Sequence, residues 1–105
     1  MSIVEIGPIQ TGELKPAVFD FGEHELEADE TIVNILGVTC RRWEGKPDAD
    51  PDAVLEGDAT VVGRTVVQEV NYRQYGTVYL LQCTVRGSTN SRHTLSALLG
   101  QVAAT

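Results

Sequence analysis

The stretch Thr77-Val78-Tyr79-Leu80-Leu81-Gln82-Cys83-Thr84-Val85-Arg86 contains the clearest structural pattern of the chain. Every second side chain from Tyr79 to Val85 is apolar or a thiol, and the positions between include Gln82 and Thr84. Side chains two residues apart lie on the same face of a β-strand, so this alternation predicts a strand with one face in a core. Turn-forming residues at 71–76 and 87–91 bound the strand on both sides.

Further β-rich stretches surround this strand, and they predict the fold class. They lie at residues 3–6, 18–22, 31–43 and 59–70. Gly63 divides the last stretch into two short strands or bends a single one, and a bulge at Gly37 would reconcile the apolar residues on both faces of 31–43. Six or seven short strands separated by turns predict an all-β, immunoglobulin-like antiparallel β-sandwich with Greek-key-like pairing.

The last segment, residues 94–102, fits two structures. Leu95, Leu98, Leu99 and Val102 have helical spacing, whereas Leu95, Ala97 and Leu99 alternate as in a strand. Periodicity alone supports the helix and the strand equally for this segment.

A chain of 105 residues is long enough for one domain and one modest core. Residues 7–16 contain Pro8, Pro16 and two glycines and lack a buried pattern. We therefore expect an extended N-terminal arm or linker at residues 1–16 and the sandwich domain at residues 17–105. Residues 46–58, with two prolines and several aspartates, are predicted as an acidic loop.

The charge of the chain limits its partners. Fifteen acidic and eight basic residues give a net charge of -7, which opposes binding to nucleic acid. No apolar run approaches a membrane span and the N-terminus lacks a signal-peptide pattern, so we expect no membrane contact and synthesis in a cytoplasm. Residues 1–59 hold fourteen acids and four bases, a net of -10, and residues 60–105 hold one acid and four arginines, a net of +3. Either the loops are simply solvated, or a negative face of one copy meets a positive face of another.

The candidate chemical motifs are incomplete. Asp48-x-Asp50-x-Asp52 resembles the start of an EF-hand loop, but Ala53 and Ala59 stand where the glycine and the bidentate glutamate are needed. His24 and His93 have no metal-ligand or acid–base partner at close spacing, and no nucleophile motif or phosphate loop occurs. We therefore expect no metal, no cofactor and no enzymatic activity. A small hydrolase would need a site assembled only in space.

The two cysteines, Cys40 and Cys83, have no CxxC partner. Each lies in a predicted strand, and we expect buried, reduced thiols. A disulfide between neighbouring strands is the alternative.

The order of these features resembles a family of small immunoglobulin-like structural proteins of tailed bacteriophages. The matching residues extend from Leu14 to about Val102 and comprise Leu14-Lys15-Pro16, Val18-Phe19-Asp20-Phe21, Leu26, Asp29-Glu30-Thr31-Ile32, the two stretches 63–70 and 76–85, and Arg92-His93-Thr94-Leu95-Ser96-Ala97. The resemblance implies a virion protein without a cofactor, whose partners are other neck, tail, fibre or capsid proteins in a homo-oligomeric array or ring. It also favours a strand for the last segment. The longer acidic loop and the position of Trp43 differ from the family pattern.

Candidate interface residues follow from composition and position. Trp43, with Arg41 and Arg42, combines residue types that are enriched at interface hot spots, although Trp43 could equally cap the edge of the core. Arg73 and Arg92 are expected to meet acidic loops of a neighbour, as are Arg64 and Arg86. Ile3, Val4 and Ile6 form either an edge strand or an arm that adds a strand to a neighbour's sheet.

We expect an adaptor at the head–tail neck or tail-fibre attachment, because of the small size and the N-terminal segment. A capsid decoration or head-fibre protein is the first alternative. The second is a protein- or carbohydrate-binding module that uses Trp43, Tyr72 and Tyr75.

Overall fold

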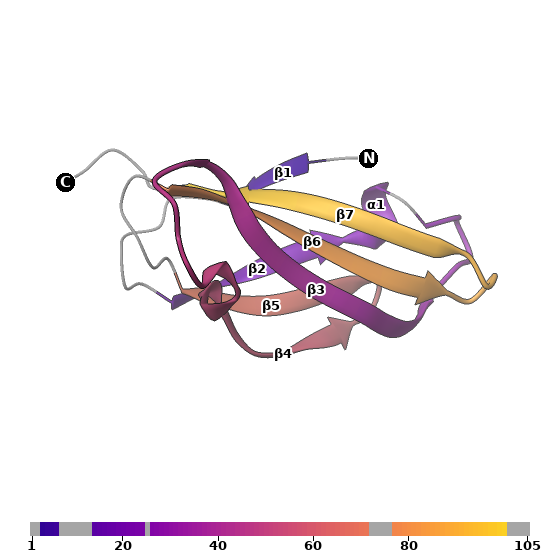
Figure 1. The fold of residues 1–105 in the computed structure, drawn as a ribbon. Helices are drawn as coiled ribbons and strands as arrows, with labels where there is room; N and C mark the ends of the chain where they lie inside the picture. The colour runs from indigo at the N-terminus through magenta and orange to yellow at the C-terminus, as the bar shows by residue number, and fades with distance from the viewer. Residues whose placement is uncertain (1–2, 7–13, 25, 72–76, 101–105) are drawn as a thin grey trace.

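The computed structural model describes residues 3–6, 14–24, 26–71 and 77–100, and their elements form two packed β-sheets (Figure 1). In chain order the elements are β1 (Ile3–Ile6), β2 (Leu14–Asp20), α1 (Phe21–His24), β3 (Ile32–Gly45), the 3₁₀-helix η1 (Pro51–Val54), β4 (Leu55–Val62), β5 (Thr65–Asn71), β6 (Thr77–Gly87) and β7 (Arg92–Leu99). The first sheet has the order β1-β7-β6-β3, and the second has the order β2-β5-β4.

This strand order is that of an immunoglobulin-like sandwich. The strands β2, β5 and β4 correspond to B, E and D of that fold, and β3, β6 and β7 correspond to C, F and G. Neighbouring strands are antiparallel except for β1, which pairs in parallel with β7. The predicted all-β sandwich of about seven strands is therefore confirmed.

The core lies between the two sheets, where the alternating side chains of β6 meet those of β2 and β5. Tyr79, Leu81, Cys83 and Val85 are completely buried, as their alternation predicts. The opposing sheet contributes the buried side chains Ala17, Phe19, Val66 and Val70, and Phe21 and Val54 close the core from α1 and η1.

Of the two alternatives for residues 3–6, an edge strand or an arm, the structure shows the edge strand. Ile3–Ile6 is the edge strand β1 of the sandwich itself, and Leu14–Pro16 begins β2 by pairing with residues 69–71 of β5. Pro16 suggested a linker, yet proline is tolerated here because β2 is an edge strand. Residues 7–13 lie outside the described residues.

Two other boundaries differ from expectation, and two open alternatives are resolved. The strand expected at 18–22 ends at Asp20, because Phe21 turns into α1. The acidic loop is shorter than 46–58, since η1 and the start of β4 occupy 51–58. Gly63 separates β4 from β5 as a hairpin turn with φ 62°, a backbone angle that glycine adopts readily. The last segment is a strand from Arg92 to Leu99.

Candidate interaction surface

The edge strand β3 carries three β-bulges, and each bulge exposes a large apolar side chain. Its register against β6 shifts between Ile32 and Asn34, between Ile35 and Gly37, and between Arg42 and Glu44. The extra residues are therefore Val33, Leu36 and Trp43, whose exposed fractions are 60%, 40% and 45%. The predicted bulge beside Gly37 is confirmed, and the other two could not be located without the partner strand.

Bulges on an edge strand have two physical effects. They interrupt the row of backbone groups that could pair with another strand, and they turn side chains away from the regular alternation. The strand β3 therefore resists extension of the sheet while it presents apolar side chains to solvent. Exposed apolar side chains gathered on one element are a common feature of protein–protein contact sites.

The predicted anchors Arg41, Arg42 and Trp43 lie together at the end of β3, and all three are exposed. Trp43 does not belong to the core cluster, so the alternative in which it caps the core is not observed. The Arg42 guanidinium donates a hydrogen bond of 3.0 Å to the carbonyl oxygen of Gly45, which holds this side chain along the strand end.

Arg92, which is expected to meet an acidic loop of a neighbour, lies at the other end of the same sheet. It pairs with Arg86, whereas the Trp43 bulge lies beside Val78, eight residues away along β6. Eight residues of strand span about 26 Å, so the two groups form separate patches. Two arginines directly opposite each other on neighbouring strands repel, and this pair creates a basic patch. Nη1 of Arg86 donates 2.7 Å to Oδ1 of Asn90. Arg73 lies outside the described residues.

The N-terminal candidates Ile3, Val4 and Ile6 belong to β1, opposite Ser96, Ala97 and Leu99 of β7. They thus occupy the edge of the four-stranded sheet that lies farthest from β3. Only their backbone pairing is described, so their role in a neighbour's sheet stays a prediction.

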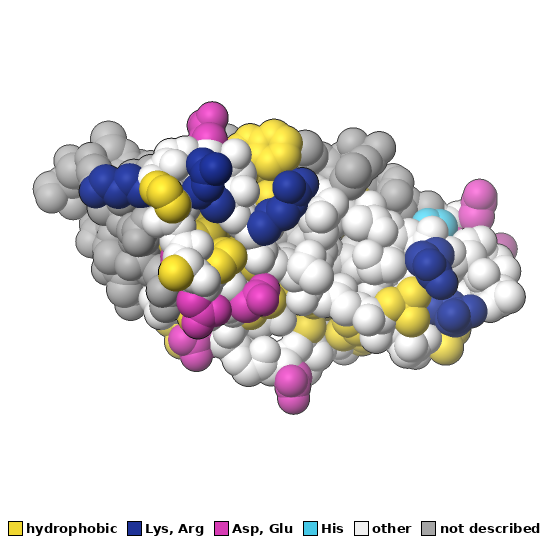
Figure 2. Space-filling view, in the orientation of Figure 1, with side chains coloured by type: hydrophobic (Ala, Val, Ile, Leu, Met, Phe, Trp, Pro, Cys, Tyr) yellow, Lys and Arg dark blue, Asp and Glu magenta, His cyan; other side chains and the backbone are white. Residues whose placement is uncertain are grey.

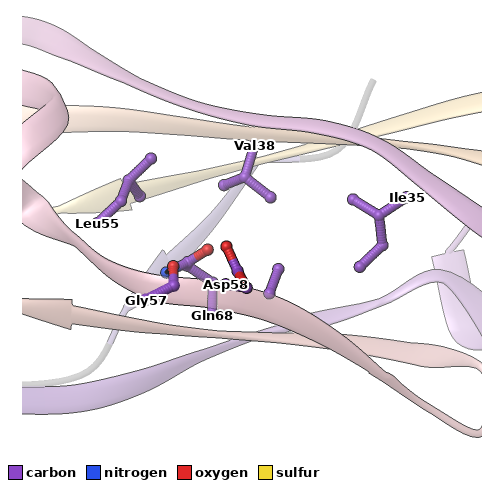
Figure 3. A pocket seen from close by; sticks show the side chains of 7 residues that line it. Ile35, Val38, Leu55, Gly57, Asp58 and Gln68 are labelled. Carbon is purple, nitrogen blue, oxygen red and sulfur yellow. Dashed lines mark hydrogen bonds between the residues drawn. The ribbon is translucent and has the colours of Figure 1, made fainter.

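A groove of about 310 Å³ lies beside β3, between the edges of the two sheets. It is lined by Ile35, Val38, Leu55, Gly57, Asp58, Ala59 and Gln68. Figure 3 shows Ile35 and Val38 pointing from β3 toward β4 across this opening. The buried Gln68 amide donates to the carbonyl oxygens of Glu56 and Gly57 at 3.1 and 3.2 Å, which fixes the irregular part of β4 below the groove. Sequence reasoning did not identify this groove, because its walls come from two different sheets.

The connection from β3 to β4 is acidic and ordered by its own hydrogen bonds. Asp48 accepts from the hydroxyl of buried Tyr79 at 2.7 Å and from the backbone amide of Asp50 at 2.9 Å. The carboxylates of Asp50, Asp52, Glu56 and Asp58 are exposed. This part of the molecule therefore presents negative charge from a defined backbone.

A buried carboxylate, Glu30, holds the opposite end of the molecule together. It accepts hydrogen bonds from the Thr89 hydroxyl at 2.6 Å and from the Glu27 backbone amide at 3.1 Å, and Nε2 of His93 lies 3.1 Å from both of its oxygens. The hydrogen bond from Thr89 lowers the pKa of Glu30 most, and the hydrogen bonds from Glu27 and His93 and the charge of His93 lower it further. Together these effects outweigh burial, which raises the pKa. They lower the pKa of Glu30 from 4.5 to about 2.

Glu30, Glu27, Thr89 and His93 form a cluster that we call the Glu30 clamp, and its geometry is that of a structural contact. The carboxylate stands between the Thr89 hydroxyl and the His93 imidazole, whereas an activated nucleophile requires the imidazole between hydroxyl and carboxylate. His93 is thus half-buried, and its acidic partner Glu30 lies 63 residues away in the sequence. Of His24 only its backbone, in α1, is described.

Arg64 belongs to this clamp and not to a free basic patch. Its Nε donates 3.1 Å to the carbonyl oxygen of Glu30, and its Nη2 donates 2.5 Å to that of Glu27. Arg64 lies in the β4–β5 hairpin, and its two hydrogen bonds hold the turn before β3 against this hairpin. The expectation that Arg64 meets an acidic loop of a neighbour therefore does not fit the structure.

Cys40 and Cys83 are free thiols, and both are buried in the core. Burial raises the pKa of each from 9.0 to about 12, and the charges of Asp52 and Asp48 add to the rise at Cys40. A thiol with so high a pKa is a poor nucleophile at neutral pH.

Within the described residues, no three His, Cys, Asp or Glu side chains are grouped as metal ligands. No helix in this part of the chain has the length and apolar character needed to cross a membrane. Comparison with protein-family models, curated proteins and solved structures gave no match to this chain. The fold and the surface features of β3 and its neighbours are therefore the basis for a functional assignment.

Proposed function

We propose that this protein is a non-enzymatic structural component of a tailed-phage virion that joins other virion proteins through contacts made by several copies. The immunoglobulin-like sandwich is the fold that the resemblance to small phage structural proteins implies. The observation that carries the proposal is the edge strand β3, whose three bulges expose Val33, Leu36 and Trp43. Apolar side chains held outward by a rigid strand suit an adhesive role, because little conformational entropy is lost on binding.

We place the protein at the head–tail neck or the tail-fibre attachment. The N-terminal strand β1 supports this placement, since it pairs with β7 at an otherwise open sheet edge. A short terminal strand that recognises such an edge could pair in the same way with a neighbouring protein. Decoration of the capsid surface or a head fibre is the alternative within the same class.

The copy number of the chain in purified particles tests the proposal. Quantitative mass spectrometry against labelled peptides would give about a dozen copies or fewer for a neck or fibre adaptor, and hundreds for capsid decoration. Absence from purified particles of the phage that encodes the chain would contradict the virion role in both forms.

The exposed indole of Trp43 favours one further candidate, a module that binds protein or carbohydrate on its own. Such a module would bind a glycan array or host cells as an isolated monomer, and Trp43→Ala would abolish that binding. A virion adaptor would show no such binding in either form.

A further inference from the structure

The face of the molecule in Figure 2 carries opposite charge arrangements at its two ends. At the end near η1, acidic side chains gather below a row of Lys and Arg side chains. At the end near the β6–β7 hairpin, Lys and Arg side chains lie below an acidic one. A two-fold rotation that reverses the long axis would therefore place opposite charges against each other.

Six exposed or partly exposed charged residues lie at defined places near the two ends of this face. Asp50, Asp52, Glu56 and Asp58 supply the exposed acid on the β3–β4 connection and β4, and Arg86 and Arg92 supply the basic patch. Among the described residues none of these six side chains has an ion-pair partner. Their charges are available to a partner.

Apolar surface connects the two charged ends. The groove between β3 and β4 exposes parts of Ile35, Val38 and Leu55 (Figure 3), and the exposed bulge residue Val33 lies on the same strand. Leu36 is not part of this surface, because it lines a separate depression with Gln82 and Thr84. One end of this surface meets the acidic residues, since Asp58 lines the groove, and the other end lies at Ile35, opposite Val85 and next to Arg86. An interface commonly has an apolar centre and a charged rim, and this face has both.

We infer that the β3–β4 face binds a second copy of this chain in an antiparallel, two-fold arrangement. The grooves of the two copies pack together at the centre, and Val33 extends the apolar contact along β3. The acidic residues around Glu56 and Asp58 of each copy contact Arg86 and Arg92 of the other. The inference rests on the proposed function in that it defines one of the multi-copy contacts.

The antiparallel arrangement is favoured over two others. A head-to-tail contact would also join acid to arginine, but it would leave the apolar groove in water. Pairing of β3 with β3 as a continuous sheet is opposed by the three bulges, which interrupt the backbone ladder. Side-chain packing across a two-fold axis satisfies both the charges and the groove.

A charge-swap experiment tests the orientation. The first variant carries Arg86→Glu and Arg92→Glu, and the second carries Glu56→Arg and Asp58→Arg. Each variant alone would associate at least about tenfold more weakly than the wild type, because both symmetric contacts become repulsive. Mixed in equal amounts they would form a one-to-one heterodimer, since both contacts are then restored. Sedimentation velocity measures all three states.

Substitutions of two valines with similar exposure, Val33 at 60% and Val18 at 53%, test the apolar centre. Val33→Asp places a charge in the interface and would lower the dimer affinity by about a hundredfold. Val18→Asp is the matched control, because Val18 is 53% exposed but lies on β2, the edge of the other sheet farthest from β4. It would leave the affinity unchanged, and circular dichroism confirms that both variants keep the fold.

Three results would overturn the inference. They are a wild-type chain that stays monomeric up to about 1 mM, open-ended growth with concentration, and a mixture of charge variants that does not associate. A monomer found at fixed copy number in virions would remove the dimer and leave the proposed function intact. A dimer in solution, with the chain absent from purified particles, would contradict the proposed function and leave the dimer intact.

Discussion

Replacement of Arg64 by methionine should destabilise the fold and leave association between copies unchanged. Methionine keeps an unbranched apolar stem but removes the guanidinium, and with it the two hydrogen bonds to the carbonyl oxygens of Glu30 and Glu27. These bonds connect the β4–β5 hairpin to the turn that begins β3. Without them the turn keeps the contacts of the Glu30 carboxylate and the hydrogen bonds between Thr31 and Ser88.

The magnitude follows from the surroundings of the two bonds. A hydrogen bond from a charged donor contributes about 1.5–3 kcal/mol when it is buried and less when water can replace the donor. Arg64 is half-buried and its bond to Glu27 is exposed, so we take the lower part of the range for the pair. The expected loss is about 2 kcal/mol, which corresponds to a fall in Tm of about 8–16 °C for a domain of this size.

Urea unfolding followed by far-ultraviolet circular dichroism measures this loss. Arg41→Met is the matched control, because Arg41 is exposed and should change the unfolding free energy by less than about 0.5 kcal/mol. Equal midpoints for the two variants, with equal slopes, would refute the role given to Arg64. A change in dimer affinity for Arg64→Met alone would also refute it.

Three further predictions concern the clamp and the thiols. Gly87→Ala should destabilise the domain strongly, because its Cβ would overlap the held Glu30 carboxylate, whereas Gly100→Ala, with its nearest neighbour at 3.7 Å, should have little effect on thermal unfolding. Ionised Glu30, whose pKa is lowered to about 2, adds stability that is complete above pH 4.5 and is lost as the pH falls toward 2, so Glu30→Gln should remove this part of the acid dependence in urea titrations between pH 2 and 6. Cys40 and Cys83, with pKa values raised to about 12, should react with a thiol reagent at neutral pH only as fast as the native chain opens, and rapid reaction of the folded protein would contradict their burial.

The parts of the fold that were predictable are those with local, regular patterns. The alternation from Tyr79 to Val85 identified the strand β6 and its buried face, since burial on one side leaves a period of two in the sequence. Gly37 indicated one bulge in β3, because apolar residues change parity there. The bulges at Val33 and Trp43 leave no such mark, since they exist only relative to the register with β6.

The clamp was not predictable because its members are distant in sequence. Glu30 ends a run of acidic residues and resembles its solvated neighbours, while Thr89 and His93 are 59 and 63 residues away. Its burial follows from the meeting of the β6–β7 hairpin with the turn before β3, a tertiary event without a local signal. The interface candidates show the same division. Residue type left exposure and core capping of Trp43 equally open, and the distance of Arg92 from Trp43 likewise required the sheet.

Small-angle X-ray scattering of the wild-type chain is the most direct test of the claim that copies join through the β3–β4 face. A single chain measures 43 × 24 × 22 Å. The account predicts a particle with twice the mass of one chain at sufficient concentration and a longest dimension close to that of a single chain, because the copies lie side by side. A mass of one chain at every concentration, or a doubled mass with about twice the length, would contradict it.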